Sequence, residues 1–152
     1  MINNDVFKYI EPSRIIDIQS DNKKGALQEL INVICQSPEI TDRKLFKEKI
    51  FEREKYVSTG IGYGIAIPHI RDNSIKDFVM ALGRKREGMD YEAIDNKPVR
   101  LIFMIGGNND QKDKYINFLS QLTTKLKDQN FKNSILKARG PDQIYEIVQS
   151  KL

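Results

Sequence analysis

The apolar side chains that follow Asp21 recur at intervals of three and four residues, which is the spacing of one buried helix face. Asp21 or Asn22 can supply the side-chain cap that begins this helix. A second helix is expected from Thr41 and Asp42 to about Lys55, because either side chain suits a helix start. The apolar contacts expected from the two helices are Leu27, Leu30, Ile31, Ile34, Leu45, Phe46 and Ile50.

Helices are also expected at both ends of the chain. A short helix over Asp5–Ile10 stops before Pro12, since proline does not continue a helix. Pro141 suits the first turn of a last helix that follows Gly140. Helical spacing of apolar positions predicts one helix through Tyr115, Leu119, Leu122 and Leu126, a shorter one through Phe131, Ile135 and Leu136, and the last through Ile144, Ile147 and Val148.

Continuous apolar runs predict the strands. Arg14–Ile18 is a short strand, and Phe78–Leu82 and Val99–Ile105 are the strongest, the latter apolar enough to be buried on both faces. The run Ile-Ala-Ile over 65–67 is also strand-like, whereas 87–98 is expected to be irregular or a weak edge strand. Helices thus alternate irregularly with strands. This predicts an α/β (α+β) fold, with a single mixed sheet of about five strands flanked by helices on both faces.

Length and charge limit the class of protein. The 152 residues, 39% of them hydrophobic, suit one domain with its own core. The apolar runs fall short of the ~20 residues that span a bilayer, and the first residues lack the pattern of a signal peptide. We therefore expect a cytoplasmic protein without membrane insertion. The net charge is +4, and the basic residues are scattered among acidic ones, so no nucleic-acid partner is expected.

The chain has one cysteine and one histidine, which limits its chemistry. Cys35 alone cannot form an intramolecular disulfide or a CxxC site, and its place near the end of a helix favours a packing role. His69 alone cannot form a cluster of histidine ligands. No metal site and no cofactor are predicted.

Residues 57–69, with the sequence VSTGIGYGIAIPH, hold the candidate chemistry. Three glycines, of which Gly60 is the first, can bring backbone amides close to a ligand, and Pro68 fixes the turn that presents His69. The glycines precede the apolar run, an order that fits neither a dinucleotide fingerprint nor a P-loop. From these residues alone, His69 is either an ordinary strand-end residue or an imidazole held beside amides that receive an anion.

The run STGIGYGIAIPH over 58–69 resembles the IIA phosphocarrier domains of the bacterial phosphoenolpyruvate-dependent phosphotransferase system, in the mannitol/fructose class. The run AIDNKPV over 93–99 and the ERE pattern over 52–54 match the family as well, and the similarity extends through nearly the whole chain. Within this class, the chain looks most similar to the nitrogen-regulatory branch. The resemblance implies a single type-2 IIA domain over residues 1–152.

In this family the histidine that closes the AIPH motif accepts a phosphoryl group, which implies that role for His69. The implied donor is HPr or a nitrogen-branch HPr-like protein. The group then passes to a IIB component for sugar uptake or acts as a regulatory signal. The alternative is a non-catalytic regulatory protein whose choice of protein targets is switched by phosphorylation.

The resemblance also implies roles for residues around His69. Arg53 stands at the family's arginine position, and a guanidinium can hold two phosphoryl oxygens. Ser58, Thr59 and Gly60 are candidates to bind the phosphoryl group, although Thr59 is equally well explained as a turn residue. Most relatives carry a second histidine where this chain has Tyr115. A tyrosine can donate a hydrogen bond there but is no cation near neutral pH, and Tyr115 could equally just continue the apolar helix face.

Overall fold

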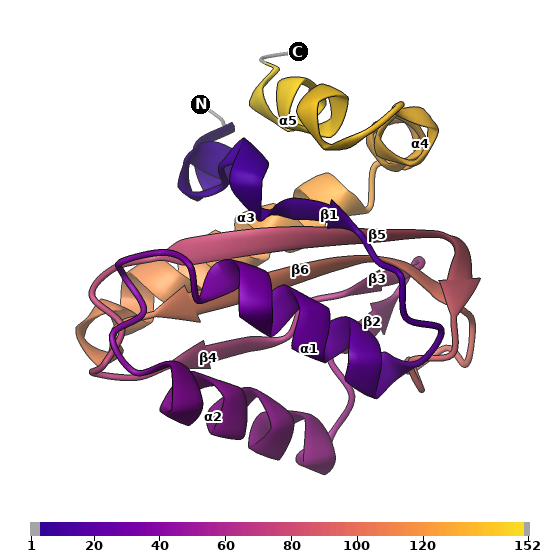
Figure 1. Ribbon diagram of the computed structural model, residues 1–152. Helices are drawn as coiled ribbons and strands as arrows, with labels where there is room; N and C mark the ends of the chain where they lie inside the picture. Colours follow the sequence, from indigo (N-terminus) through magenta and orange to yellow (C-terminus); the bar gives the residue numbers. More distant parts are fainter. Residues whose placement is uncertain (1–3, 151–152) are drawn as a thin grey trace.

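The computed structural model describes residues 4–150, which form one mixed sheet with helices against both faces (Figure 1). The strand order is β1-β5-β6-β3-β2, and β4 pairs with β6 beyond β3. Strands β5 and β6 are antiparallel, whereas β1, β3 and β4 run parallel to their long neighbours. The strands are β1 (Ile15–Asp17), β2 (Gly60–Gly62), β3 (Ile65–Ala66), β4 (His69–Arg71), β5 (Val79–Met89) and β6 (Val99–Gly107).

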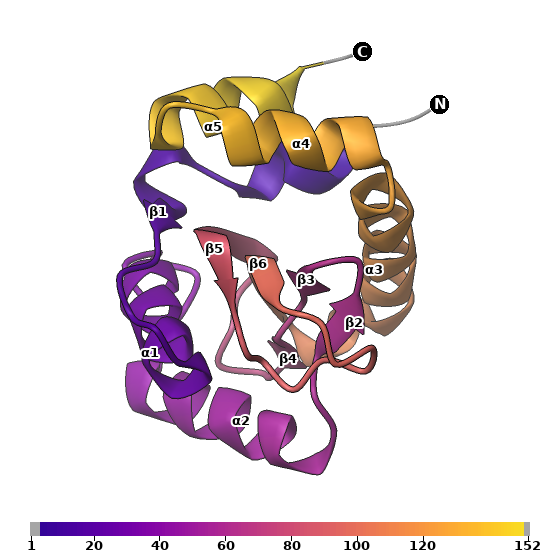
Figure 2. The ribbon, with the colours of Figure 1, turned by 90° about the vertical axis from the view of Figure 1, so that its right-hand side faces the viewer.

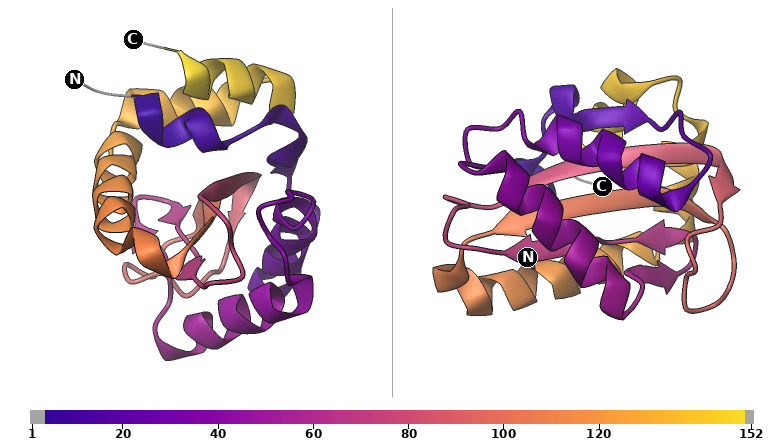
Figure 3. Two further views of the ribbon diagram at one scale, coloured as in Figure 1. Left: turned by 90° about the vertical axis from the view of Figure 1, so that its left-hand side faces the viewer. Right: turned by 60° about the horizontal axis from the view of Figure 1, so that its bottom comes forward.

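The helices divide between the two faces of the sheet (Figure 2). Helices α1 (Lys23–Ile34) and α2 (Arg43–Tyr56) lie across one face, as Figure 3 also shows. The other face is covered by α3 (Lys112–Leu126), α4 (Gln129–Lys137), α5 (Pro141–Gln149) and a 3₁₀ helix, Asn4–Tyr9. Short 3₁₀ turns occur at Pro12–Arg14 and Asn109–Gln111. No helix within residues 4–150 is both long and apolar enough to cross a membrane.

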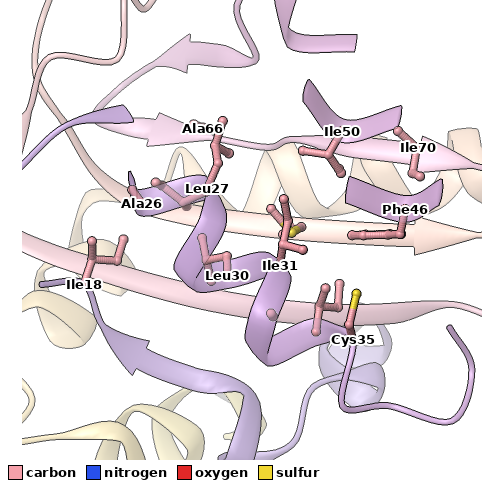
Figure 4. Close-up of a cluster of buried hydrophobic side chains, with 14 of the residues drawn as sticks. Ile18, Ala26, Leu27, Leu30, Ile31, Cys35, Phe46, Ile50, Ala66 and Ile70 are labelled. Carbon is pink, nitrogen blue, oxygen red and sulfur yellow. The ribbon is translucent and has the colours of Figure 1, made fainter. Parts of the chain in front are cut away.

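The fold prediction is confirmed, with six strands where about five were expected. Each predicted helix is found near its expected position, and the first of them is a 3₁₀ helix. Strand β6 is buried on both faces, as its apolar run predicts. Because neighbouring strand residues point to opposite sides, Ile102 and Met104 pack beneath α1 and α2, whereas Leu101 and Phe103 pack beneath α3. Figure 4 shows the first of these clusters, in which Cys35 is a buried packing residue.

Strand β5 is longer than predicted and continues to Met89, into the segment expected to be irregular. The apolar run ends at Leu82, so the charged residues after it suggest an exposed segment. Arg84 is nevertheless fully buried, because Asp17 on β1 accepts two hydrogen bonds from its guanidinium, at 2.7 and 3.0 Å. Two carbonyl groups at the end of α4 accept further hydrogen bonds from it. An ion pair and several hydrogen bonds thus keep a charged residue buried within the sheet.

The N-terminal cap of α1 provides a test of local stability. The side chain of Asn22 accepts a hydrogen bond from the backbone N–H of Gly25 at 2.8 Å, whereas Asp21 pairs with Lys85 instead. Asn22→Ala is expected to lower the free energy of unfolding by about 0.5–2 kcal/mol. Asp21→Ala should lower it less, because it leaves the cap in place. Urea unfolding of both variants checks this, and an equal or larger loss in Asp21→Ala would contradict the assignment.

Candidate functional site

The glycine motif forms a β-hairpin. Strands β2 and β3 are antiparallel, and the turn between them contains Tyr63 and Gly64, whose φ angles are +62° and +77°. Positive φ at both central residues is typical of a tight hairpin turn. The turn lies beside the first residues of β6, whereas His69 pairs with Ile105 near the end of that strand. The expectation that the later glycines, Gly62 and Gly64, place amides beside His69 is therefore wrong.

His69 is the first residue of β4, and its ring is partly exposed. The ring nitrogen Nδ1 lies 2.6 Å from the carbonyl oxygen of Ile67. A carbonyl oxygen only accepts hydrogen bonds, so we assign the ring hydrogen to Nδ1, which donates it. In the neutral imidazole this leaves Nε2 with a free lone pair. The local backbone therefore selects the nitrogen that can act as a nucleophile.

The surroundings of His69 lower the pKa of its imidazole and so favour the neutral form. Burial is the largest influence and lowers the pKa below the ordinary 6.5, while the hydrogen bond to Ile67 raises it. The positive charge of Arg53 lowers the pKa further, and the carboxylate of Glu54 opposes this. The net direction is downward.

Arg53 lies in the last turn of α2, as predicted, and its charge acts on the His69 site. Its Nη1 donates a hydrogen bond to the carbonyl oxygen of Val57 at 2.9 Å, which holds the side chain at the end of the helix. Its charge lowers the pKa of both His69 and Tyr115. The fold thus brings together the three residues predicted as catalytic, which come from α2, β4 and α3.

Tyr115 on α3 contacts the His69 ring, with 5.8 Å between the two ring centroids. The Tyr115 ring also stacks on Phe78, with 5.9 Å between the ring centroids and an interplanar angle of 11°. The Tyr115 hydroxyl is buried and has no hydrogen-bond partner within residues 4–150. Burial raises its pKa, so the hydroxyl keeps its proton at neutral pH. An unused donor therefore lies in the side chain next to the imidazole.

Arg71 is a second cation in this region that the sequence analysis missed. Its guanidinium carbon lies 5.5 Å from the centre of the Tyr115 ring, and its charge lowers the pKa of that tyrosine. Arg71 follows His69 by two positions in β4, and both residues are partly exposed while Ile70 between them is buried. Strand alternation therefore places Arg71 on the same side as His69. That period-two pattern is the signal that could have identified it.

Comparison with known proteins settles the family. Residues 9–151 match the family model described as the phosphoenolpyruvate-dependent sugar phosphotransferase system, EIIA 2. The chain belongs to this EIIA 2 family. A fructose-specific EIIABC component from Bacillus subtilis is 35% identical over 88% of this chain, which spans only 21% of that protein. A nitrogen regulatory protein from Klebsiella oxytoca is 30% identical, over 97% of this chain and 94% of that protein.

A solved structure supports the same assignment for this EIIA 2 chain. The crystal structure of the nitrogen regulatory protein IIA-Ntr from Neisseria meningitidis matches with a TM-score of 0.85 at 28% identity. The match covers 94% of this chain and 98% of that one. The predicted family is therefore confirmed, and proteins from its sugar-specific and nitrogen-regulatory branches are both similar to this chain.

The three residues of this EIIA 2 protein predicted to bind the phosphoryl group have other partners in the structure. Glu54 accepts hydrogen bonds from the Thr59 backbone N–H at 2.8 Å and from its hydroxyl at 2.7 Å. The Gly60 N–H donates to the Ser58 hydroxyl oxygen, which itself donates to the carbonyl of Tyr91. A phosphoryl-binding role for these residues stays a prediction. In the structure, the two hydrogen bonds from Thr59 to Glu54 connect the loop after α2 to the end of that helix.

Proposed function

We propose that this EIIA 2 protein is a cytoplasmic phosphocarrier that accepts a phosphoryl group on Nε2 of His69. The proposed donor is a phosphohistidine protein, HPr or a nitrogen-branch HPr-like carrier. The bond between phosphorus and the donor nitrogen breaks as a bond to Nε2 forms. The observation that supports this most is the hydrogen bond from Nδ1 to Ile67, which leaves Nε2 as the free nucleophile.

The residues around His69 suit the charge that develops during such a transfer. The three equatorial oxygens of the phosphoryl group carry most of the negative charge at the transition state. We propose that Arg53 binds one or more of these oxygens and that Arg71 adds a second positive charge. The Tyr115 hydroxyl donates a hydrogen bond to the bound group, in the place where most relatives carry a histidine. Since the transfer consumes one phosphohistidine and forms another, the exchange is nearly balanced in free energy.

Incubation with phosphoenolpyruvate and the general phosphotransferase proteins tests this function. The protein should take up one acid-labile phosphoryl group. If neither HPr nor a nitrogen-branch HPr-like carrier transfers a group to it, the proposal is contradicted. A purified fructose-class IIB component is then added to the phosphorylated protein. Transfer of the label to the IIB component would identify a role in sugar uptake.

A regulatory role is the second candidate, and the match to a nitrogen regulatory protein over nearly the whole chain favours it. In this role the phosphorylated protein keeps its label in the presence of IIB. Its capture of target proteins should differ between the phosphorylated and unphosphorylated states. Identical capture in both states would contradict the regulatory role while leaving the phosphocarrier proposal intact.

The lowered pKa of His69 predicts how the reaction depends on pH. The neutral imidazole is the nucleophile, so the rate of phosphoryl acceptance should be constant above pH 7 and fall as the pH drops through the pKa of His69. The free energy of unfolding should also fall as the pH drops. Below pH 6.5 the unfolded chain binds a proton that the folded site resists, so the free energy of unfolding decreases.

Titration of the ring signals by NMR measures this pKa directly, because the chain has a single histidine. The midpoint should lie below 6.5. A midpoint above 6.5 would mean that the site stabilises the imidazolium, which would contradict the neutral nucleophile.

The unused hydroxyl of Tyr115 predicts opposite effects on stability and activity. Tyr115→Phe removes a buried group without a partner, so the free energy of unfolding should stay the same or rise. The rate of phosphoryl acceptance should fall by about 2- to 10-fold, because one hydrogen bond to the bound phosphoryl group is lost. Tyr145→Phe on α5 serves as the control and should leave the rate unchanged. An unchanged rate in Tyr115→Phe would show that this ring only packs.

A further inference from the structure

A cavity lies at the end of the sheet away from His69. It has a volume of about 870 Å³ and is bordered by the β2–β3 hairpin, by β5 and β6, and by α4. The hairpin turn contacts the start of β6, where the Gly64 carbonyl accepts hydrogen bonds from the first residues of that strand, whereas His69 pairs with Ile105. Four of the side chains that line the cavity are cationic, namely Arg86, Lys97, Arg100 and Lys132.

Lys132 is the most unusual of these side chains because it is buried without a counter-ion. The residue is only 5% exposed, and its ammonium group donates a hydrogen bond to the carbonyl oxygen of Tyr63 at 2.9 Å. The Tyr63 ring lies 5.4 Å from the same ammonium group. No carboxylate lies within 4.0 Å of it in the part of the chain that the structure describes. A buried charge that lacks an opposite charge is costly, and a bound anion would offset that cost.

The acidic residues of the cavity do not cancel its positive charge. Glu87 and Asp95 also line it, which leaves an excess of cations over carboxylates. The Glu87 carboxylate pairs with Lys85 at 3.5 Å. The Asp95 carboxylate accepts a hydrogen bond from the backbone N–H of Lys97 at 3.0 Å. Both carboxylates therefore have partners of their own.

The two arginines are held in place by backbone groups and keep further donors available. Arg100 Nε donates to the carbonyl oxygen of Arg86 at 2.7 Å, and Arg86 Nη2 donates to the carbonyl oxygen of Ala138. A guanidinium has five N–H donors, so each arginine has others left for a ligand. Arginine suits phosphate because two parallel N–H groups match two phosphate oxygens.

We propose that this cavity binds a small phosphorylated metabolite, with its phosphate group between Lys132 and the two arginines. The excess of positive charge favours a ligand with at least two negative charges. The volume is that of a small-molecule site rather than of a single ion, and the exposed ring of Tyr63 offers a surface for the rest of the molecule. The site is separate from His69, so the proposal does not depend on phosphoryl transfer.

Titration with pyrophosphate, followed by NMR at constant ionic strength, tests the proposal. We expect saturable shifts of the backbone amides of Gly62, Gly64 and Lys132. Lys132→Met should weaken binding at least ~10-fold, because it removes the buried charge and keeps an apolar stem of similar length. Lys24→Met removes one exposed charge on α1 and should leave the affinity unchanged.

Lys132→Met should remain folded, since it removes a buried charge whose desolvation opposes folding. Arg100→Gln, at an exposed position, provides a second variant and should also weaken binding. Three results would overturn the proposal: shifts that do not saturate, shifts confined to the surroundings of His69 and Arg53, or equal affinity in Lys132→Met and the unaltered protein.

Discussion

Replacing His69 with alanine is expected to abolish phosphoryl acceptance from any phosphohistidine donor. The chain has no other histidine, so no second imidazole can take up the group. The phosphoramidate that we expect on Nε2 is labile in acid, unlike a phosphate ester on serine or threonine. Incubation with phosphoenolpyruvate and the general phosphotransferase proteins, followed by acid treatment, should therefore show labile label in the unaltered protein and none in His69→Ala.

The control for this variant is a measurement of its unfolding temperature, which shows whether it is still folded. Within the described residues, His69 makes one side-chain hydrogen bond, to a carbonyl two residues earlier, and the residue is partly exposed. His69→Ala should therefore unfold at a temperature close to that of the unaltered protein. Label that persists in a folded His69→Ala protein would place the acceptor on another residue and contradict the proposed function.

Replacing Arg53 with alanine is expected to slow phosphoryl acceptance at least ~10-fold, which corresponds to about 1.4 kcal/mol in the activation free energy. The guanidinium is close enough to lower the pKa of both His69 and Tyr115, so its charge also acts on a phosphoryl group bound to Nε2. The only side-chain hydrogen bond it makes within residues 4–150 is to the Val57 carbonyl. Single-turnover kinetics with a phosphorylated donor measure the rate of transfer without interference from later steps.

Two further variants separate the role of the guanidinium from a general effect of charge. Arg53→Lys keeps the positive charge and loses the paired N–H groups, so its rate should lie between those of Arg53→Ala and the unaltered protein. Lys55→Ala removes an exposed charge from the same turn of α2 and should leave the rate unchanged. Equal slowing by Arg53→Ala and Lys55→Ala would mean that the donor protein responds to surface charge alone.

The sequence predicted the helices and the apolar strands well because their patterns are local. Helix α1 begins after Asn22, one of the two caps considered, and its apolar face is buried as expected. The extent of β5 was not predictable in this way. The Arg84 side chain is buried because it pairs with Asp17, a residue far away in the chain. A local pattern does not reveal such a tertiary contact. The β2–β3 hairpin was missed because its glycines also fit a ligand-binding loop.

The candidate site was predicted through resemblance more than through pattern. The family motif identified His69, and the structure places Arg53 and Tyr115 around it. Spacing alone could not show that Thr59 binds Glu54, because a threonine before a glycine fits a turn or a ligand contact equally well. Nor could it show which imidazole nitrogen is free, since that depends on the position of the Ile67 carbonyl.

The most direct test of the phosphocarrier function locates the phosphoryl group on the imidazole. Protein labelled with ¹⁵N in its single histidine is phosphorylated by phosphoenolpyruvate and the general proteins and then studied by NMR. Our proposal predicts coupling between ³¹P and Nε2 of His69, with the hydrogen on Nδ1 still donated to Ile67. Phosphorylation at Nδ1, or a histidine that stays unmodified with both kinds of donor, would contradict it.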